Sequence, residues 1–188
     1  MTDTTTTLDV PGYKAGTWVL DPAHSEVTFS LRHMMISKVR GEFGLKSATI
    51  EAPANPLEAK VTASVDAASI STGDQNRDNH LRSADFFDVE TYPTIDFVST
   101  GVRYEGGDFL VDGDLTMHGV TKPVTFELEF GGFGTDPYGN YKAGATAKTV
   151  VNREDFGLTW NAALETGGVL VGKDVTINLD LQGTLQQD

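Results

Sequence analysis

Strict alternation of apolar and polar residues runs through most of this 188-residue chain. Between residues 124 and 130, for example, the apolar residues Val124, Phe126 and Leu128 are each followed by a polar one. This two-residue period is typical of a β-strand with one face in a core and the other in water. It recurs between turn residues over residues 18–20, 24–34, 36–51, 58–66, 94–104, 109–117, 124–130, 141–151 and 175–181. We expect an all-β chain of about eight strands.

One segment breaks the alternation. Thr72-Gly73-Asp74 is a turn cluster, and the side chain of Asp74 or Asn76 is suited to cap a short helix over residues 76–84. On that helix Arg77 and His80 share a face, because residues three or four apart are neighbours on a helix surface. The alternation resumes at residue 94. We therefore expect one short helix that interrupts the β structure without starting a helical domain.

Half-buried strands in this number cannot remain a single open sheet, because an entire apolar face would stay in water. The sheet must close into a barrel or fold over as a sandwich, and closure also removes the exposed edges. An eight-stranded barrel has an interior that side chains fill or that holds one small ligand. Small residues in the phase that we assign inward favour open space inside: Ala63, Gly113, Ala143, Ala145 and Ala147.

Composition narrows the function classes. The chain has 14 Lys and Arg against 27 Asp and Glu, a formal net charge of −13, which opposes binding to nucleic acid and docking on anionic membranes. No run of about 18 apolar residues is present to span a bilayer. Residues 1–16 lack the basic and apolar regions of a secretory signal, so we expect a disordered tail over residues 1–16, a single domain over residues 17–188 and a cytoplasmic protein.

The sequence carries no recognisable catalytic motif. There is no Gly-x-Ser-x-Gly elbow, no glycine-rich phosphate loop and no His-Glu-x-x-His. Cysteine is absent, which excludes thiolate nucleophiles, disulfides and zinc sites built on sulfur. The four histidines, at positions 24, 33, 80 and 118, include no pair at metal-ligand spacing. We therefore predict no enzymatic activity, no metal site and no cofactor.

Several motifs, in their order and spacing, resemble the YceI-like family. They include Leu20-Asp21-Pro22-Ala23-His24-Ser25, Val39-Arg40-Gly41-Glu42-Phe43, Asp85-Phe86-Phe87-Asp88, His118-Gly119-Val120-Thr121-Lys122-Pro123 and Asn152-Arg153. The resemblance covers roughly residues 18–185. It implies an extended eight-stranded antiparallel β-barrel similar to lipocalins, with an apolar tunnel for a long-chain lipid, in some members a polyisoprenoid. Many members are periplasmic and have a signal peptide, which we do not find here. The resemblance is also compatible with a homodimer.

The barrel and the resemblance together predict the residues that face a ligand. Inward apolar residues are expected to line the tunnel: Val27, Phe29, Leu31, Phe97, Phe109, Val111, Leu115, Phe126 and Leu128. Imidazole and guanidinium groups donate hydrogen bonds to phosphate or carbonyl oxygens. We accordingly predict polar contacts with a lipid head group from His33, Arg77, His80 and Arg153.

Each of these roles has a structural alternative. Arg77 lies among Asp74, Asp78 and Asp85, so an ion-pair network that fixes the helix accounts for it equally well. His33 is equally interpreted as a hydrogen-bonded structural histidine, and the apolar residues would form the core of any β fold. The sequence favours a barrel that binds, sequesters or transports a polyisoprenoid or fatty-acid-derived lipid. It leaves open an enzyme acting on such a lipid and a partner-binding domain with a filled core.

Overall fold

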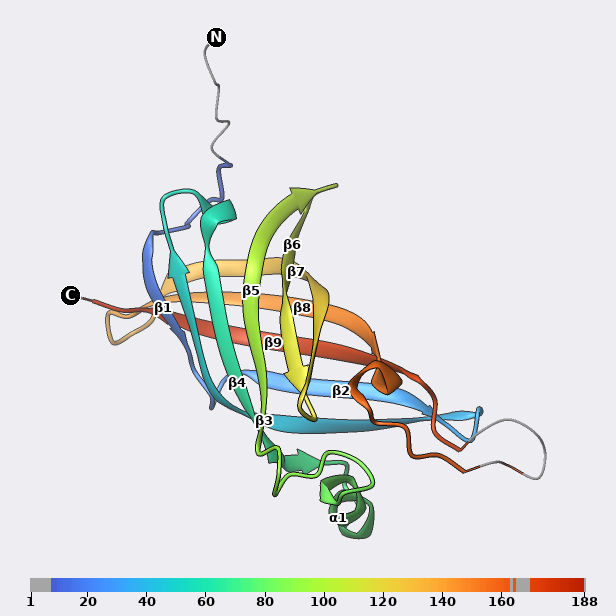
Figure 1. Ribbon diagram of the computed structural model, residues 1–188. Helices are drawn as coiled ribbons and strands as arrows, with labels where there is room; N and C mark the ends of the chain where they lie inside the picture. The colour runs from blue at the N-terminus through green and yellow to red at the C-terminus, as the bar shows by residue number, and fades with distance from the viewer. Residues whose placement is uncertain (1–7, 163, 165–169, 188) are drawn as a thin grey trace.

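The computed structural model describes residues 8–162, 164 and 170–187. Within them nine strands form a single antiparallel sheet, and one α-helix lies at one end of it (Figure 1). The sheet order is β1-β3-β2-β9-β8-β7-β6-β5-β4, and pairing of β3 with β4 closes it. The elements are β1 Gly16–Leu20, β2 Glu26–His33, β3 Ser37–Ala52, β4 Lys60–Ser71, α1 Gln75–Arg82, β5 Thr94–Glu105, β6 Asp108–Met117, β7 Val120–Thr135, β8 Tyr141–Asn152 and β9 Asp174–Leu185.

The nine strands make an eight-stranded barrel because β1 and β2 share one position. In β1, Trp18 lies opposite Ile50 of β3 and Leu185 of β9. In β2, Phe29 lies opposite Gly41 of β3 and Ile177 of β9. The two short strands therefore lie end to end between the same two long ones. The predicted closed, eight-stranded antiparallel barrel with one short helix is confirmed.

Two aromatic rings inside the barrel lie across glycines of the neighbouring strand. A Cβ atom at Gly41 would meet the Phe29 ring at 2.3 Å, and one at Gly113 would meet the Phe97 ring at 2.4 Å. No other residue leaves room for a ring so close to the backbone. These glycines let Phe29 and Phe97 lie flat against the barrel wall and keep its interior open.

Helix α1, Gln75–Arg82, begins one residue before the predicted range and ends two residues before the end of that range. The Asp74 side chain caps it by accepting a hydrogen bond from the backbone N–H of Arg77 at 3.1 Å. The predicted range, residues 76–84, extends two residues too far, because Ser83 adopts an extended conformation and its hydroxyl donates to the carbonyl of His80 at 2.6 Å. With eight residues α1 is short, and among the described residues no helix is long and apolar enough to cross a membrane.

Hydrogen bonds to β4 and to Thr72 just after it hold α1 in place, rather than ion pairs of Arg77 with the neighbouring aspartates. The Arg77 guanidinium donates to the hydroxyl and the carbonyl of Thr72 at 2.7 and 2.9 Å. The buried carboxylate of Asp78 accepts from the backbone N–H of the same threonine at 2.9 Å. Arg82 donates to two carbonyls of β4, each at 2.8 Å. The helix is thereby fixed over one end of the barrel (Figure 1).

Packed aromatic side chains fill the opposite end. Trp18 is only 5% exposed, and its ring centre lies 6.1 Å from that of Phe133 and 5.8 Å from that of Tyr141. Edge-to-face and tilted contacts at such distances are favourable for aromatic rings. This end is therefore closed by side chains.

Part of the segment predicted as a tail lies against this closed end. The Tyr13 hydroxyl donates to the carbonyl of Pro53 at 2.5 Å. The carbonyl of Lys14 accepts a hydrogen bond from the Trp18 indole at 3.0 Å. The prediction of a disordered tail therefore does not fit the residues next to β1, which pack on the barrel. Residues 1–7 lie outside the described residues.

Candidate ligand cavity

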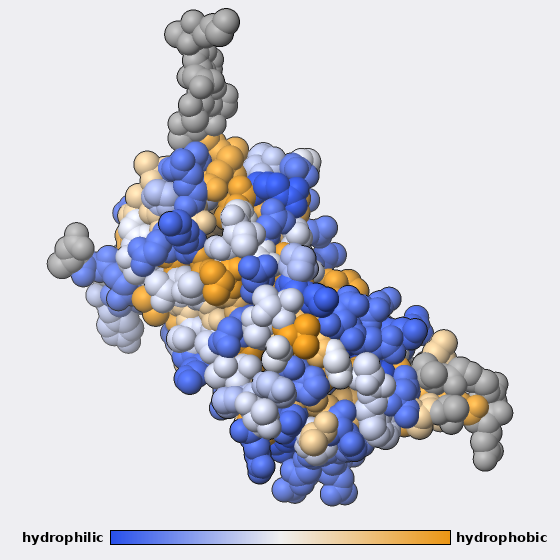
Figure 2. Space-filling model, in the orientation of Figure 1, coloured by the Kyte–Doolittle hydropathy of each residue, from blue (hydrophilic) through white to orange (hydrophobic). Residues whose placement is uncertain are grey.

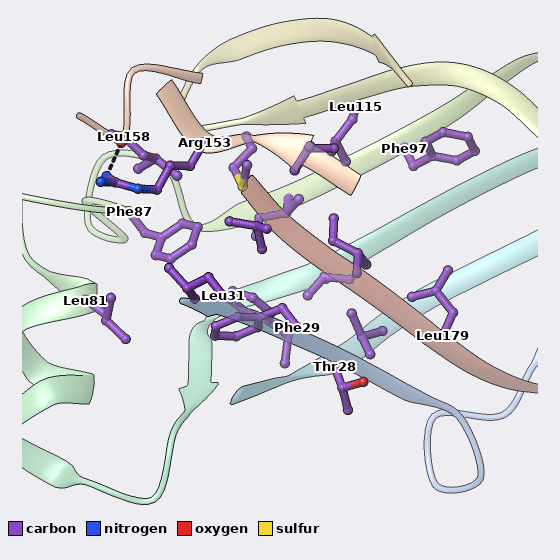
Figure 3. A pocket seen from close by; sticks show the side chains of 18 of the residues that line it. Thr28, Phe29, Leu31, Leu81, Phe87, Phe97, Leu115, Arg153, Leu158 and Leu179 are labelled. Carbon is purple, nitrogen blue, oxygen red and sulfur yellow. Dashed lines mark hydrogen bonds between the residues drawn. The ribbon is translucent and has the colours of Figure 1, made fainter. Parts of the chain in front are cut away.

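A cavity of about 560 Å³ occupies the barrel interior towards the α1 end. All eight barrel positions contribute to its wall, and it is completed by α1 together with Leu158, Trp160, Leu170 and Val171. Its lining is almost entirely aliphatic and aromatic (Figure 3). The volume falls within the range of about 300–1,000 Å³ that small-molecule sites have.

Eight of the nine predicted tunnel residues lie on this wall: Val27, Phe29, Leu31, Phe97, Val111, Leu115, Phe126 and Leu128. The ninth, Phe109, faces the interior but lines a second cavity of about 130 Å³ nearer the β1 end. Alternation along β6 predicts that Phe109 points inward. It does not predict the level along the barrel axis, which depends on the register between strands.

The two cavities lie in line along the barrel axis, because they share part of their walls. The shared residues are Leu20, Ile50, Val61, Val111, Leu128 and Leu181. These six side chains form a ring between the larger cavity and the smaller one. The interior is therefore one apolar channel, narrowed at this ring and closed beyond it by the packed aromatic residues.

The polar residues predicted for the site gather at the α1 end of the larger cavity, which we call the mouth. His33, Arg77, His80 and Arg153 all contribute to its wall. The His80 side chain is 39% exposed, so the cavity reaches the surface there, and its Nε2 atom lies 2.8 Å from a carboxylate oxygen of Asp85. The Arg77 guanidinium is held at the mouth by its two bonds to Thr72.

Arg153 is at the mouth but is committed to the backbone. It is 3% exposed, and its guanidinium donates to the carbonyls of Leu158, Trp160, Val171 and Gly172. Figure 3 shows the bond to Leu158. Burial lowers the pKa of this guanidinium below its ordinary value. Arg153 therefore links residues 158–160 to residues 171–172 at one side of the mouth, and its donors are directed at carbonyl groups rather than at the cavity.

An aromatic cluster beside the mouth was missed by the sequence analysis. The rings of His80, Phe86 and Trp160 lie 4.9–5.3 Å apart, centre to centre, and all three line the cavity. Trp160 follows no alternating strand pattern, so periodicity gave no reason to place it inside. The available signal was a tryptophan in a loop, since such a large apolar side chain rarely lacks a contact surface.

The wall offers apolar contact and few polar groups. Among the described residues no buried side-chain nitrogen or oxygen lacks a hydrogen-bond partner. In the same part of the chain no three His, Asp or Glu residues lie close enough together to hold a metal ion. The polar groups that do reach the cavity belong chiefly to its mouth.

The sequence model of the YceI-like domain matches residues 18–183, from β1 almost to the end of β9. The chain belongs to the YceI-like family. A UPF0312 protein of Staphylococcus aureus is 37% identical over 172 residues, which cover 90% of this chain and 98% of that protein. The family membership that the motifs predicted is therefore confirmed.

Solved structures show the same YceI-like fold. Burkholderia cenocepacia BcnA aligns with a TM-score of 0.75 at 25% identity, over 87% of this chain and 98% of that one. The YceI protein of Campylobacter jejuni aligns with a TM-score of 0.69 at 28% identity, over 84% and 91%. A domain of Saccharophagus degradans described as polyisoprenoid-binding aligns with a TM-score of 0.69 at 18% identity, over 90% and 98%, a likeness of fold alone.

Proposed function

We propose that this protein binds one long-chain apolar lipid, polyisoprenoid or fatty-acid-derived, inside its barrel and keeps it from water. The observation that carries the proposal is the cavity of about 560 Å³, whose wall is almost entirely apolar and whose polar side chains gather chiefly at its mouth. A polar ligand would leave its hydrogen-bonding groups without partners on such a wall. An alkyl or isoprenoid chain would not.

Burial of the chain supplies the affinity. Each methylene group removed from water contributes about 0.8 kcal/mol, so eight buried carbons gain roughly 6 kcal/mol before ordering costs are subtracted. The smaller cavity beyond the ring of six shared residues extends the same apolar channel. A longer chain gains more if its end displaces that ring.

The mouth fits the polar end of such a molecule. Arg77 and His80 contribute donor groups at the point where the cavity reaches the surface. The rings of Phe86 and Trp160 beside them provide a flat surface for the first part of the chain. In this proposal the polar residues orient the ligand and perform no chemical step. The structural neighbour described as polyisoprenoid-binding has the same fold, which agrees with the proposal.

The first test is native mass spectrometry of freshly purified protein, followed by organic extraction and identification of any released lipid. We expect a long-chain isoprenoid or acyl species at about one per chain. Protein that carries no lipid and takes up neither a polyprenol nor a long-chain fatty acid when offered contradicts the proposal.

A matched pair of variants tests the location. Ala147 is 5% exposed and lines the cavity, whereas its neighbour Thr146 faces outward on the same strand. Ala147→Phe is expected to fill the cavity and abolish uptake, and Thr146→Phe to leave uptake unchanged. Equal uptake by both variants places the ligand elsewhere.

The cytoplasmic location and the homodimer stay predictions.

A further inference from the structure

The turn between β2 and β3 exposes three apolar side chains in a row. Met34, Met35 and Ile36 are 43%, 55% and 79% exposed. The hairpin that carries them projects beyond the barrel at the α1 end (Figure 1). At that end of the molecule the space-filling view shows apolar surface next to grey atoms (Figure 2). We call these three residues the hairpin tip.

The backbone of the hairpin tip is unfavourable for the residues that it holds. Met34 has a φ of 54° and Met35 a φ of 63°, in the left-handed region that suits Gly, Asn and Asp. An Asn-Gly pair is the common choice for two such positions in a tight hairpin. Folding and solubility alone would thus select different residues here.

The outer face of the same hairpin is basic. Leu31 and Val39 line the cavity, so their sequence neighbours Arg32, Lys38 and Arg40 face outward, and all three are exposed. Arg32 lies directly opposite Lys38, an arrangement of like charges that destabilises a strand pair. Residues 30–41 contain no Asp or Glu, in a chain that has 27 of them.

The hairpin tip borders the mouth of the cavity. His33, next to the tip, is part of the cavity wall. The carbonyl of Arg32 accepts a hydrogen bond from the N–H of Gly172 at 2.9 Å, and the N–H of Met34 donates to the carbonyl of Leu170 at 2.8 Å. A surface that receives the tip therefore also lies next to the opening.

We propose that the β2–β3 hairpin docks on an anionic membrane surface. Met34, Met35 and Ile36 enter the boundary between head groups and acyl chains, and Arg32, Lys38 and Arg40 pair with lipid phosphates. An apolar tip with flanking cations matches both layers of that boundary. An uncharged apolar partner would use only one of the two features.

The net charge of −13 does not prevent this contact. At physiological ionic strength charges are screened beyond about 8 Å, so a projecting hairpin meets the membrane with its own local charge. The docking surface does not rest on the proposed ligand, because it is defined by exposed residues outside the cavity. If the cavity binds a lipid, the membrane at the docking surface is the place from which the lipid is taken or to which it is delivered.

Co-sedimentation with vesicles tests the charged part of the proposal. We expect binding to phosphatidylcholine vesicles that contain phosphatidylglycerol, little binding to phosphatidylcholine alone, and weakening of the former as salt is raised. The variant R32Q/K38Q/R40Q is expected to bind the anionic vesicles about 100-fold more weakly, since each cation contributes roughly fivefold. The matched control is K60Q/K122Q/K148Q, which removes three exposed lysines elsewhere on the barrel and has the same net charge. It should bind like the wild type.

A second variant tests the apolar tip. M34N/M35G/I36S removes the apolar side chains and suits the left-handed backbone, so we expect vesicle binding to fall at least tenfold while Tm rises by roughly 2–4 °C. If Met34, Met35 and Ile36 served folding alone, the substitutions would change Tm without weakening vesicle binding. Tyr138→Ser removes an apolar residue that is 88% exposed in the β7–β8 turn and should change neither.

Three outcomes would overturn the proposal. One is equal binding of the wild type to neutral and anionic vesicles, and another is equal weakening by the two charge variants. The third is sedimentation velocity showing a wild-type dimer that M34N/M35G/I36S dissociates, because the tip would then be a contact between copies. Lipid extraction from the wild type reports on the cavity separately, so a failure of the proposed function is distinguishable from a failure of docking.

Discussion

The two ends of the barrel both carry aromatic clusters, and the clusters differ in what supports them. At the β1 end, Trp18 belongs to a strand that is hydrogen-bonded on both sides, to β3 and to β9, and its ring packs against Phe133 and Tyr141. At the α1 end, Trp160 lies on a loop and packs against His80 and Phe86.

The comparison shows that ring contacts alone do not decide whether an aromatic cluster closes a barrel. At the β1 end a strand carries Trp18 and fixes it, so the interior ends in packed side chains. At the α1 end a loop carries Trp160 and leaves an entrance. The position of this loop depends on a few hydrogen bonds, here those of Arg153. The predictions that follow test this difference between a closed end and an entrance.

The largest effect is expected from truncation of the two tryptophans. Trp18→Ala should lower the free energy of unfolding by about 3–5 kcal/mol, because it leaves a large void in a packed cluster. Trp160→Ala removes a half-buried ring at the entrance and should cost about 1 kcal/mol. Urea unfolding of both variants measures the difference. Equal costs would mean that the α1 end is packed as firmly as the β1 end.

Arg153→Gln is expected to cost about 3 kcal/mol, because four carbonyls lose a charged donor and part of that backbone is buried. Arg153→Lys should recover little of this loss, since an ammonium group does not reproduce the planar fork of a guanidinium. Hydrogen exchange should show the loss of protection first around residues 158–162 and 170–172. Uniform loss over the whole barrel would instead place Arg153 in the common core.

Two glycine substitutions compare the interior with the region nearer the mouth. A Cβ atom at Gly113 would meet the Phe97 ring at 2.4 Å and also a backbone carbonyl oxygen at 2.6 Å, so Gly113→Ala should cost about 2–3 kcal/mol. At Gly41 the two closest atoms belong to the Phe29 ring, which has the cavity to move into. Gly41→Ala should cost about 1 kcal/mol and reduce lipid uptake. Thermal unfolding and uptake assays measure these effects.

The smallest effect concerns an ion pair on the outside of the barrel between β5 and β6. Hydrogen bonds from Arg103 and Thr125 lower the pKa of Asp112 from 3.8 to about 2. Because the folded-state pKa is the lower one, the pair stabilises the fold above pH 4 or so and loses this contribution as the pH falls towards 2. Asp112→Asn should cost less than about 1 kcal/mol near pH 7, since the pair is accessible to solvent. The difference from the wild type should vanish near pH 2 in urea titrations.

Much of the fold was predictable because its determinants are local. A strand with one face in water is recognised by its alternation of apolar and polar residues. The side chain of Asp74 caps the helix through the backbone N–H of Arg77, only three residues away. The same alternation predicted which side chains point into the barrel, and eight of the nine predicted tunnel residues lie on the wall of the larger cavity. The family motifs added the identity of the barrel, which the alternation alone left open against a sandwich.

The rest depended on residues that are distant in sequence. Register between β5, β6 and β7 places Phe109 in the smaller cavity. The four carbonyls that accept hydrogen bonds from Arg153 belong to Leu158, Trp160, Val171 and Gly172. The sequence around Arg153 gives no sign of these partners. Trp160 became part of the entrance only because its loop folds back towards α1.

The sequence by itself thus determined which residues form strands, which face of each strand is apolar, where the helix begins and which family the chain resembles. These properties follow from periodicity, capping and local motifs. The tertiary structure decided that β1 and β2 share one position, that one end of the barrel is packed and the other open, and that the basic hairpin with its apolar tip stands beside that opening. Closure of a sheet and the packing of loops are set by contacts between distant segments, and no local pattern encodes them.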